Sequence, residues 1–429
     1  MCGIYYSTRK DSVDTSGSRD NGLKRRGPEG WFEEDNDLGH MAYSMLSTIG
    51  QPTAQPVKND KGMLLYNGST YNQQNNDAKW ISENLSSNID SCIEFIRTLI
   101  GEYAIIWNTD SFTIFCSDVF SIRPLYFFYD EIDIFIASLP EALSCYPAQY
   151  KCEGNKIYVY DKKTKRISIL DNKHFDLSQT DGNYDRVFNA FEQAVKDRHT
   201  DKNMYTVSGG YDTGAIACCV EKNIGKFNGA FVIPNFEDKK VLAERAQRHK
   251  LKPVHFKDSE KIFSHKEIDK ILHERNYETD NSYATYGLSS IILNLMKPRQ
   301  MKIMVVGSGG DEVYADYGFG GKSLKQYKGR IEERISSKFG GRFPVHLELV
   351  WPWHNYAQYQ SSYIEKHEAV GGYWGIEMRC PMLDVRLVQA WLNTKHTLKN
   401  REYKGWMAQY MSEAKYPFDR NGRKTIFAY

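Results

Sequence analysis

The hydrophobic pattern of the chain changes its period near the middle, and no other feature of the sequence constrains the fold as strongly. Up to about residue 170 the apolar residues come in short runs such as "YAIIWN" and "FTIFCSD", separated by turn-forming stretches such as "NTDS". Runs of this kind are typical of packed antiparallel strands. We therefore expect an N-terminal domain that is built from antiparallel sheets.

The second half of the chain has a different pattern. After the polar stretch "DNKHFDLSQTDGNY", apolar residues recur with helical spacing, as at Val187, Phe191 and Val195, and the strand-like runs "MYTV" and "MKIMVV" alternate with helical segments. This alternation predicts a parallel α/β sheet. A chain of 429 residues also exceeds what one hydrophobic core usually supports. We therefore predict two domains, at residues 2–172 and 183–429.

Charge and hydropathy exclude several classes of function. Lys and Arg number 56 against 54 for Asp and Glu, so the chain lacks a strong field for polyanions and we expect no nucleic-acid partner. The first ten residues turn polar too early for a signal peptide, and no stretch approaches the roughly 20 apolar residues of a spanning helix. The eight cysteines lack metal-binding spacing. We expect a cytoplasmic protein with no membrane partner.

A cysteine follows the initiator methionine in "MCGIYY". Removal of Met1 would leave the Cys2 thiol beside its own α-amine, whose ordinary pKa of roughly 7.7 to 8.0 lets it accept the thiol proton. Cys2 could equally be a small apolar residue that packs under a sheet. The rest of the chain has to decide between these interpretations.

The stretch "YTVSGGYDTGAIACC" predicts a strand, a tight turn and a helix. Ser208, Gly209 and Gly210 remove side-chain bulk where backbone N–H groups can approach a phosphate at the positive end of a helix dipole. The spacing is neither that of a Walker loop nor that of a dinucleotide fingerprint. Asp212 and Thr213 at the helix start would also suit an ordinary capped junction, so the loop alone leaves both interpretations open.

The order of the motifs along the chain carries more information than any one of them. The first half contains "MCGI", "RRGPEG", "YNGSTYN" and "SDVFSIRPLYF", and the second contains "ETD", "VGSGGDEVYADYG", "GIEMRCPMLD" and "RKTIF". After the first of these, the series resembles the elements RGPD, NGEIYN, RDPFGIKPLYY, ETYD, SGEGSDEVFGGY, GVEARVPFLD and RQKEQF of the glutamine-dependent asparagine synthetase family. The similarity covers nearly the whole chain.

The resemblance implies a fold and a set of site residues. The N-terminal domain would be an Ntn-type αββα sandwich with glutamine amidotransferase activity. The C-terminal domain would be a parallel α/β ATP-pyrophosphatase domain, similar to adenine nucleotide hydrolases, with extra helices. The implied residues are, for catalysis, Cys2, Asn67, Gly68 and Lys424; for substrate binding, Arg26, Asp90, Glu278 and Glu377; for ATP binding, Val207, Ser208, Gly209, Gly210, Asp212, Thr213, Val232 and Gly307; and for metal binding, Asp212 and Asp311.

Chemistry gives these residues roles. Cys2 would attack the side-chain amide of glutamine, with Asn67 and the Gly68 N–H stabilising the oxyanion, although Asn-Gly is also the strongest hairpin-turn signal. Asp90 is the nearest match to the family acid that holds the glutamine amino group. The second domain would bind ATP, with Mg²⁺ between Asp212 and Asp311, and adenylate a carboxylate, nominally that of aspartate. Lys424 would neutralise charge that develops on the phosphate.

Three positions depart from the family. Met45 replaces the arginine that holds the glutamine carboxylate, and Ser308 replaces the glutamate of SGEGSDE, for which Glu377 is a candidate substitute unless it pairs with Arg379. Tyr286 falls where an arginine helps to hold aspartate, and it presents a ring with Tyr283 nearby. Because methionine and tyrosine carry no positive charge, we expect an acceptor carboxylate other than free aspartate.

Two other functions remain open at this point. The chain could be an ATP-dependent carboxylate–amine ligase of β-lactam-synthetase type with a structural Cys domain, which Met45 favours, or a synthetase-like regulatory scaffold without activity. For the amidotransferase we expect small-molecule partners, namely glutamine, ATP and the acceptor acid, and a homodimer as the assembly to test.

Overall fold

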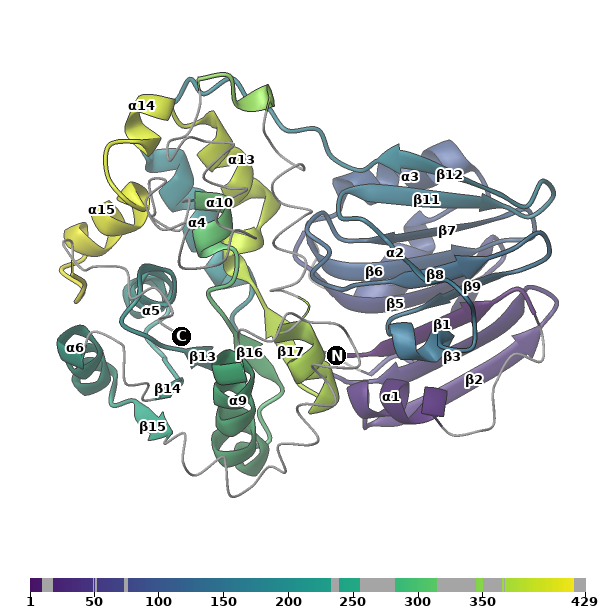
Figure 1. Cartoon of the computed structure of the whole chain (residues 1–429), viewed down its shortest axis with the longest axis horizontal. Coiled ribbons are helices and arrows are strands. Elements are labelled where there is room, and N and C mark those ends of the chain that lie inside the picture. The colour runs from purple at the N-terminus through teal and green to yellow at the C-terminus, as the bar shows by residue number, and fades with distance from the viewer. Residues whose placement is uncertain are drawn as a thin grey trace. The chain divides into compact units, whose positions relative to one another are not determined.

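The computed structural model describes residues 1–9, 18–48, 50, 52–72, 76–232, 239–254, 282–314, 345–349, 365 and 367–419. The chain forms two compact units (Figure 1). The N-terminal unit comprises Met1–His174 and the distant segment Glu368–Glu377, and the C-terminal unit comprises Phe175–His367 and Met378–Tyr429. A short piece of the second half of the sequence therefore packs with the first half.

The N-terminal unit contains two antiparallel six-stranded sheets. The first sheet has the order β10-β8-β9-β1-β3-β2, and its strands are β1 (Gly3–Ser7), β2 (Gly30–Asn36), β3 (Gly39–Met45), β8 (Tyr126–Tyr129), β9 (Ile134–Ala137) and β10 (Tyr150–Lys151). The second has the order β12-β11-β7-β6-β5-β4, with β4 (Val57–Asn59), β5 (Gly62–Thr70), β6 (Gly101–Asn108), β7 (Phe112–Ser117), β11 (Lys156–Asp161) and β12 (Arg166–Asp171).

The two sheets face each other, and helices cover their outer faces. Side chains from both sheets, including Ile4, Met41, Leu65 and Phe115, share one buried core. A second core joins the other face of the β5–β6–β7 sheet to α2 (Asp77–Asn84) and α3 (Ile89–Thr98). On the far side, α1 (Ser18–Arg26) and the 3₁₀ turn η1 (Pro140–Leu143) contact the sheet that contains β1 and β3. The predicted αββα sandwich is confirmed.

The C-terminal unit is built on a five-stranded sheet of order β15-β14-β13-β16-β17. Its strands are β13 (Asn203–Thr206), β14 (Gly229–Val232), β15 (Lys252–Val254), β16 (Ile303–Val305) and β17 (Glu377–Arg379). Strand β13 pairs in parallel with β14 on one side and with β16 on the other. The chain therefore leaves β13 toward one edge and later returns to its opposite side, which makes the β13–β16 junction a topological switch point.

Helices complete the C-terminal unit. They are α4 (Asp185–Asp197), α5 (Tyr211–Asn223), α6 (Lys239–His249), α9 (Ser282–Ile291), α10 (Gly310–Tyr314), α13 (Val385–Asn393), α14 (His396–Lys399) and α15 (Gly405–Glu413), with shorter turns η2 (Ile292–Met296), η3 (Lys297–Arg299), η4 (Leu347–Leu349) and η5 (Pro381–Leu383). Phe191 of α4 packs edge-on against Trp406 and Tyr410 of α15. The predicted parallel α/β architecture is confirmed.

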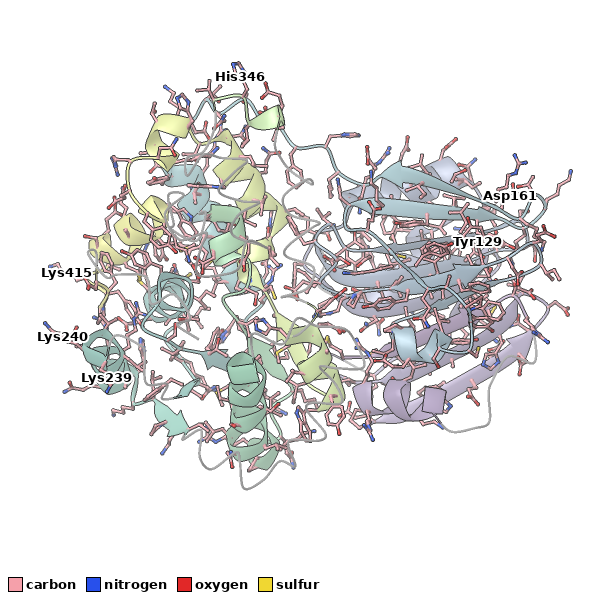
Figure 2. The ribbon with its side chains drawn as sticks, in the orientation of Figure 1. Tyr129, Asp161, Lys239, Lys240, His346 and Lys415 are labelled. Carbon is pink, nitrogen blue, oxygen red and sulfur yellow. The ribbon has the colours of Figure 1, made fainter. Side chains whose placement is uncertain are left out.

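Charged side chains lie at the periphery of the C-terminal unit, as Lys239, Lys240 and Lys415 show (Figure 2). Within the described residues, none of the helices combines the length and the apolar character that crossing a bilayer requires.

Candidate active sites

Cys2 lies at the start of β1, between the two sheets of the N-terminal unit. Only 8% of the residue is exposed, and its Sγ is 3.2 Å from the hydroxyl of Tyr43 on the neighbouring strand β3. The Leu46 N–H donates to the same sulfur at 3.4 Å. Burial raises the pKa of Tyr43, so its phenol stays protonated beside the sulfur. The thiol is thus held by polar groups in a site with little solvent.

Arg26 holds the backbone of Cys2. Its Nε donates to the Cys2 carbonyl at 2.9 Å, and its guanidinium pairs with Glu368, both side chains being almost completely buried. The arginine fork is suited to such a double contact, because its donors are fixed in one plane. The sequence analysis assigned Arg26 to substrate binding, whereas its contacts in the structure are with the Cys2 carbonyl and with Glu368.

Asn67 and Gly68 lie inside β5 and pair with Ala104 and Tyr103 of β6, so the hairpin interpretation of this Asn-Gly pair is wrong. Alternation along the strand places Asn67 on the face of Met63 and Leu65, which share a core with Cys2. Asn67 is 1% exposed, and its Nδ2 has no hydrogen-bond partner among the described residues. An unpaired buried amide is costly unless a ligand completes it, which suits an oxyanion donor.

Gly68 cannot be replaced without strain. Its φ is +138°, and a Cβ there would lie 2.0 Å from the Glu102 carbonyl oxygen of the paired strand. Only glycine adopts this conformation freely. The glycine therefore fixes the local backbone beside Asn67.

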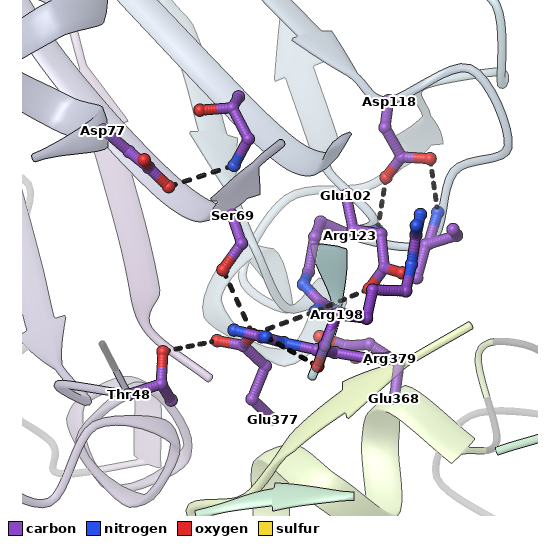
Figure 3. Close-up of polar contacts among 12 residues, drawn as sticks. Thr48, Ser69, Asp77, Glu102, Asp118, Arg123, Arg198, Glu368, Glu377 and Arg379 are labelled. Carbon is purple, nitrogen blue, oxygen red and sulfur yellow. Dashed lines mark hydrogen bonds and ion pairs between the residues drawn. The ribbon is translucent and has the colours of Figure 1, made fainter. Parts of the chain in front are cut away.

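Several polar side chains lie around the buried carboxylate of Glu377 (Figure 3). Its carboxylate accepts from the Thr48 hydroxyl at 3.1 Å and the Ser69 hydroxyl at 3.2 Å, and lies 4.0 Å from Arg123. Arg123 also pairs with Glu102 at 3.1 Å, with both side chains inaccessible to solvent. Glu377 is thus anchored within the N-terminal unit, beside the strand that carries Asn67 and Gly68.

Met1 covers this polar region. It is 1% exposed, and burial lowers the pKa of its amine to about 5, an effect that Arg26 and Arg123 increase and Cys2 and Glu377 oppose. The amine therefore lies close to the charged groups around Cys2. Loss of Met1 would remove one buried side chain from beside Cys2.

Asp90 does not lie near Cys2 and the polar residues around it. It is exposed in the first turn of α3, on the helical layer that packs against the opposite face of the sheet from the Cys2 core. The Asn88 side chain caps this helix by accepting from the Ser91 N–H. The local sequence "NIDS" thus has a helix-starting role.

In the C-terminal unit, residues 207–210 connect β13 to α5 in a half-exposed loop. The Ser208 N–H donates to the Thr213 hydroxyl at 3.0 Å, and the Gly210 N–H donates to the Ser208 hydroxyl at 3.1 Å. Arg245 is fully buried beneath the loop and donates to the Gly210 carbonyl at 2.8 Å. The N-cap of α5 is Gly210 and no side chain of the described residues caps this helix, so Thr213 stabilises the turn without capping the helix. The remaining N–H groups at the start of α5 point along the helix dipole.

A second glycine-rich turn follows β16 and packs against the first. A Cβ on Gly310 would lie 2.2 Å from the Asp212 Cγ, and one on Gly307 would lie 3.0 Å from its Cβ. Both turns leave the carboxyl ends of adjacent parallel strands at the switch point of the sheet, where α/β folds bind their ligands. The glycines thus permit the close approach that a nucleotide site here requires.

Asp212 and Asp311 meet between these turns and share a cation. The buried Lys404 ammonium contacts the Oδ1 atoms of both, at 3.0 Å in the case of Asp311, and the Tyr403 hydroxyl donates to Asp311 at 2.6 Å. Burial alone would lower the pKa of Lys404, but the two carboxylates raise it above its ordinary value. No group of three or more metal-ligating side chains occurs among the described residues.

Two carboxylates nevertheless fit Mg²⁺, which commonly binds one or two of them together with substrate phosphates. The side chains of Asp212 and Asp311 are 19% and 27% exposed, so a nucleotide could reach them. The donor set is therefore compatible with the implied metal.

Comparison with known proteins assigns the family. Residues 1–171 match a glutamine amidotransferase domain, and residues 186–418 match asparagine synthase. The chain belongs to the asparagine synthase family. The two matched domains together support a glutamine-dependent synthetase.

Solved structures add distant likenesses. The first is an allosteric regulatory enzyme of purine biosynthesis, with 13% identity and a TM-score of 0.33, for which the match covers 48% of this chain and 60% of that one. The second is a glutamine phosphoribosylpyrophosphate amidotransferase from B. subtilis complexed with ADP and GMP, with 14% identity, a TM-score of 0.34, and 73% and 77% coverage. The chain thus spans less than two thirds of the first of these. No match was found among curated proteins.

Some expectations for this asparagine synthase family member fall outside the described residues. These are the positions of Glu278 and Lys424 and the side chains of Val232, Tyr283 and Tyr286. Val232 ends β14, where it pairs with Val254 of β15. The remaining members of the ATP set, including Val207 and Gly209, lie in or beside the two turns.

The sequence analysis missed several residues of both sites. Glu102 carries no motif signal, because it is one polar residue within a strand pattern. Tyr43 lies two residues before Met45, in the stretch that departs from the family. Arg123 lies inside "SIRPLYF", so the motif could have singled it out. Lys404 stands in an ordinary polar stretch, "NREYKGW", and only the fold brings it to the two aspartates.

Proposed function

We propose that the chain is a glutamine-dependent amidotransferase that adenylates a carboxylate with ATP and then amidates it. The observation that carries this proposal is the pair of turns at the switch point, where Asp212 and Asp311 share one cation beside the Ser208–Thr213 loop. This arrangement combines N–H donors for phosphates with two hard anionic ligands. The two family domains supply the context.

In the first half-reaction Cys2 attacks the glutamine side-chain amide, and its α-amine, freed by removal of Met1, accepts the thiol proton. Asn67 and the Gly68 N–H stabilise the oxyanion, which is supported by the unpaired Nδ2 of Asn67. Loss of Met1 would make room for the substrate, since the buried methionine lies against the same charged groups. Ammonia is the product used in the second half-reaction.

In the second half-reaction ATP binds with its phosphates on the Ser208–Thr213 loop. Asp212 and Asp311 would hold Mg²⁺, which neutralises phosphate charge when bound. The acceptor carboxylate attacks the α-phosphate, pyrophosphate leaves, and amidation releases AMP. Lys424 is proposed to balance charge on the phosphate. We place the reaction in the cytoplasm.

The acceptor is proposed to be a carboxylic acid other than free aspartate, because Tyr286 falls where the family has an arginine. ATP–pyrophosphate exchange across a panel of carboxylic acids tests both the function and the acceptor. We expect exchange with at least one acid and slower exchange with aspartate. Absence of exchange with every acid would reject adenylation, and fastest exchange with aspartate would reject the acceptor assignment. Sedimentation of the same protein tests for a homodimer.

One observation favours a second candidate, an ATP-dependent ligase that uses another amine. Met45 ends β3 and packs against the core that contains Cys2. Because a methionine carries no positive charge, this position cannot bind the carboxylate of glutamine. In that case glutamine would never serve as nitrogen donor. Comparing glutamine, ammonia and a panel of primary amines as donors separates the two candidates.

A further inference from the structure

A serine–histidine pair lies beside the nucleotide site. The Ser308 Oγ is 2.6 Å from the Nδ1 of His367, a short hydrogen bond for these atoms. Ser308 lies between Gly307 and Gly310, the two glycines that pack against Asp212 at the phosphate loop. Both residues are half-buried, so the pair is held in place and still open to solvent.

The chemistry of this position needs a proton acceptor. When ammonia attacks an acyl carbon it must lose a proton, and at this position the resembled family has a glutamate where this chain has Ser308. A serine hydroxyl alone is too weak a base, but an imidazole with an ordinary pKa near 6.5 is well matched to neutral pH. The histidine could not be found from sequence, because 58 residues separate it from Ser308.

Glu377 was the earlier candidate for this role. Its carboxylate oxygens accept hydrogen bonds from the hydroxyls of Thr48 and Ser69. The Ser308 Oγ instead pairs with the Nδ1 of His367, and both residues belong to the C-terminal unit together with Asp212 and Asp311.

We infer that Ser308 and His367 form a proton relay for the amidation step, an inference that rests on the proposed function. The ammonia nitrogen bonds to the acyl carbon, and the bond from that carbon to the AMP oxygen breaks with its electron pair leaving on AMP. One proton passes from nitrogen to the Ser308 Oγ as the Ser308 proton passes to His367 Nδ1. The imidazolium then releases its proton to solvent. The relay uses the tautomer with hydrogen on Nε2.

The relay predicts a separation of the two half-reactions. Ser308→Ala and His367→Ala should each lower ammonia-dependent amide formation by roughly 100-fold, at the lower end of what a general base contributes. ATP–pyrophosphate exchange should stay within about threefold of the unsubstituted chain, since adenylation needs no such base. Retained exchange also shows that each variant is folded. His396→Ala, the same change at the start of α14, serves as matched control and should alter neither rate.

A rescue variant makes the test sharper. Ser308→Glu combined with His367→Ala restores a carboxylate at this position, and we expect it to recover at least tenfold of the lost amidation. A merely structural role for the pair would not produce this recovery. Equal loss of exchange and amidation, a normal rate in Ser308→Ala, or failure of the rescue would each overturn the relay. If the unsubstituted chain exchanges pyrophosphate with no acid, the proposed function itself fails.

Discussion

The Cys2 site and the Ser208–Thr213 loop differ in how far their side chains are exposed to solvent. Cys2 is 8% exposed, its carbonyl is held by Arg26, and Arg26 is itself paired with buried Glu368. At the loop, the Asp212 and Asp311 side chains are 19% and 27% exposed, and both contact the buried Lys404 ammonium. The proposed nucleophile is thus fixed and shielded by its surroundings, whereas the proposed nucleotide site is partly open, as a large charged ligand requires.

The difference teaches how each site is pre-organised. Around Cys2, strand pairing and a buried arginine fork fix the backbone, and the Asn67 Nδ2 has no hydrogen-bond partner in the part of the chain that the structure describes. At the loop, glycines remove bulk so that two turns can approach each other. We expect the first site to respond sharply to small changes in packing and the second to respond mainly to changes in charge.

Removal of the nucleophile should have the largest effect and should separate the sites completely. Cys2→Ala should abolish glutamine hydrolysis, because no other thiol lies at the start of β1, and leave ammonia-dependent amidation intact. The glutaminase and ammonia-dependent rates measure this, with Cys145→Ala at an exposed cysteine as control. Intact mass should show Cys2 as the N-terminus. Loss of both rates in a folded variant would contradict two separate sites.

A change of charge at the loop should have the next largest effect. Asp311→Asn removes one of the two anionic ligands, and we expect pyrophosphate exchange to fall by about 100- to 1000-fold, as when a pre-organised electrostatic group is lost. Glutamine hydrolysis should hardly change. Asp201→Asn, at an exposed aspartate in the same unit, is the matched control. Unchanged exchange would remove Asp311 from the site.

Buried cations with a carboxylate partner and those without one should differ in their response to pH. In the N-terminal unit Arg26 and Arg123 have carboxylate partners, whereas in the C-terminal unit Lys399 donates to the Gln179 amide oxygen at 3.1 Å and to the Leu392 carbonyl at 2.9 Å. Burial lowers the pKa of Lys399 from 10.5 to about 7. From pH 7 to 10 the unfolded chain therefore binds the extra proton, and stability rises with pH, by at most about 1.4 kcal/mol per unit.

Urea unfolding at several pH values measures this slope. Trp391 fluorescence can report on it, since the Lys399 Nζ lies 5.5 Å from that ring. Lys399→Met should reduce the rise, and Lys395→Met at an exposed position should leave it unchanged. Burial also lowers the pKa of Lys162 and of Lys173 to about 8, so part of the slope should remain. An unreduced slope in Lys399→Met would contradict the assignment to Lys399.

The smallest effect is expected where charge is kept and only geometry changes. Arg26→Lys retains a cation for Glu368, but a lysine lacks the planar fork that also reaches the Cys2 carbonyl. We expect glutamine hydrolysis to fall by about tenfold, equivalent to roughly 1.4 kcal/mol, with exchange unaltered. An equal fall in both rates would mean that the contacts of Arg26 with Glu368 and Cys2 stabilise the whole chain rather than the position of Cys2.

Much of this protein follows from local sequence. The change of hydrophobic period predicted packed antiparallel sheets followed by a parallel sheet. The stretch Ser208–Thr213 predicted a tight turn between a strand and a helix. Both predictions succeed because strand and helix patterns and glycine turns are short-range properties. The Asn67–Gly68 pair shows the limit of such signals. The same dipeptide suits a hairpin, and only its pairing with β6 placed it inside a strand.

The tertiary structure decided which distant residues meet. Glu368 reaches Arg26 across 342 positions, Lys404 reaches Asp212 across 192, and His367 reaches Ser308 across 59. Asp90, chosen as the nearest match to the family acid, instead lies in the first turn of an outer helix. These contacts depend on chain topology and burial rather than on local propensity, because a lone charged or polar residue has the same sequence signal in solvent as it has in a core.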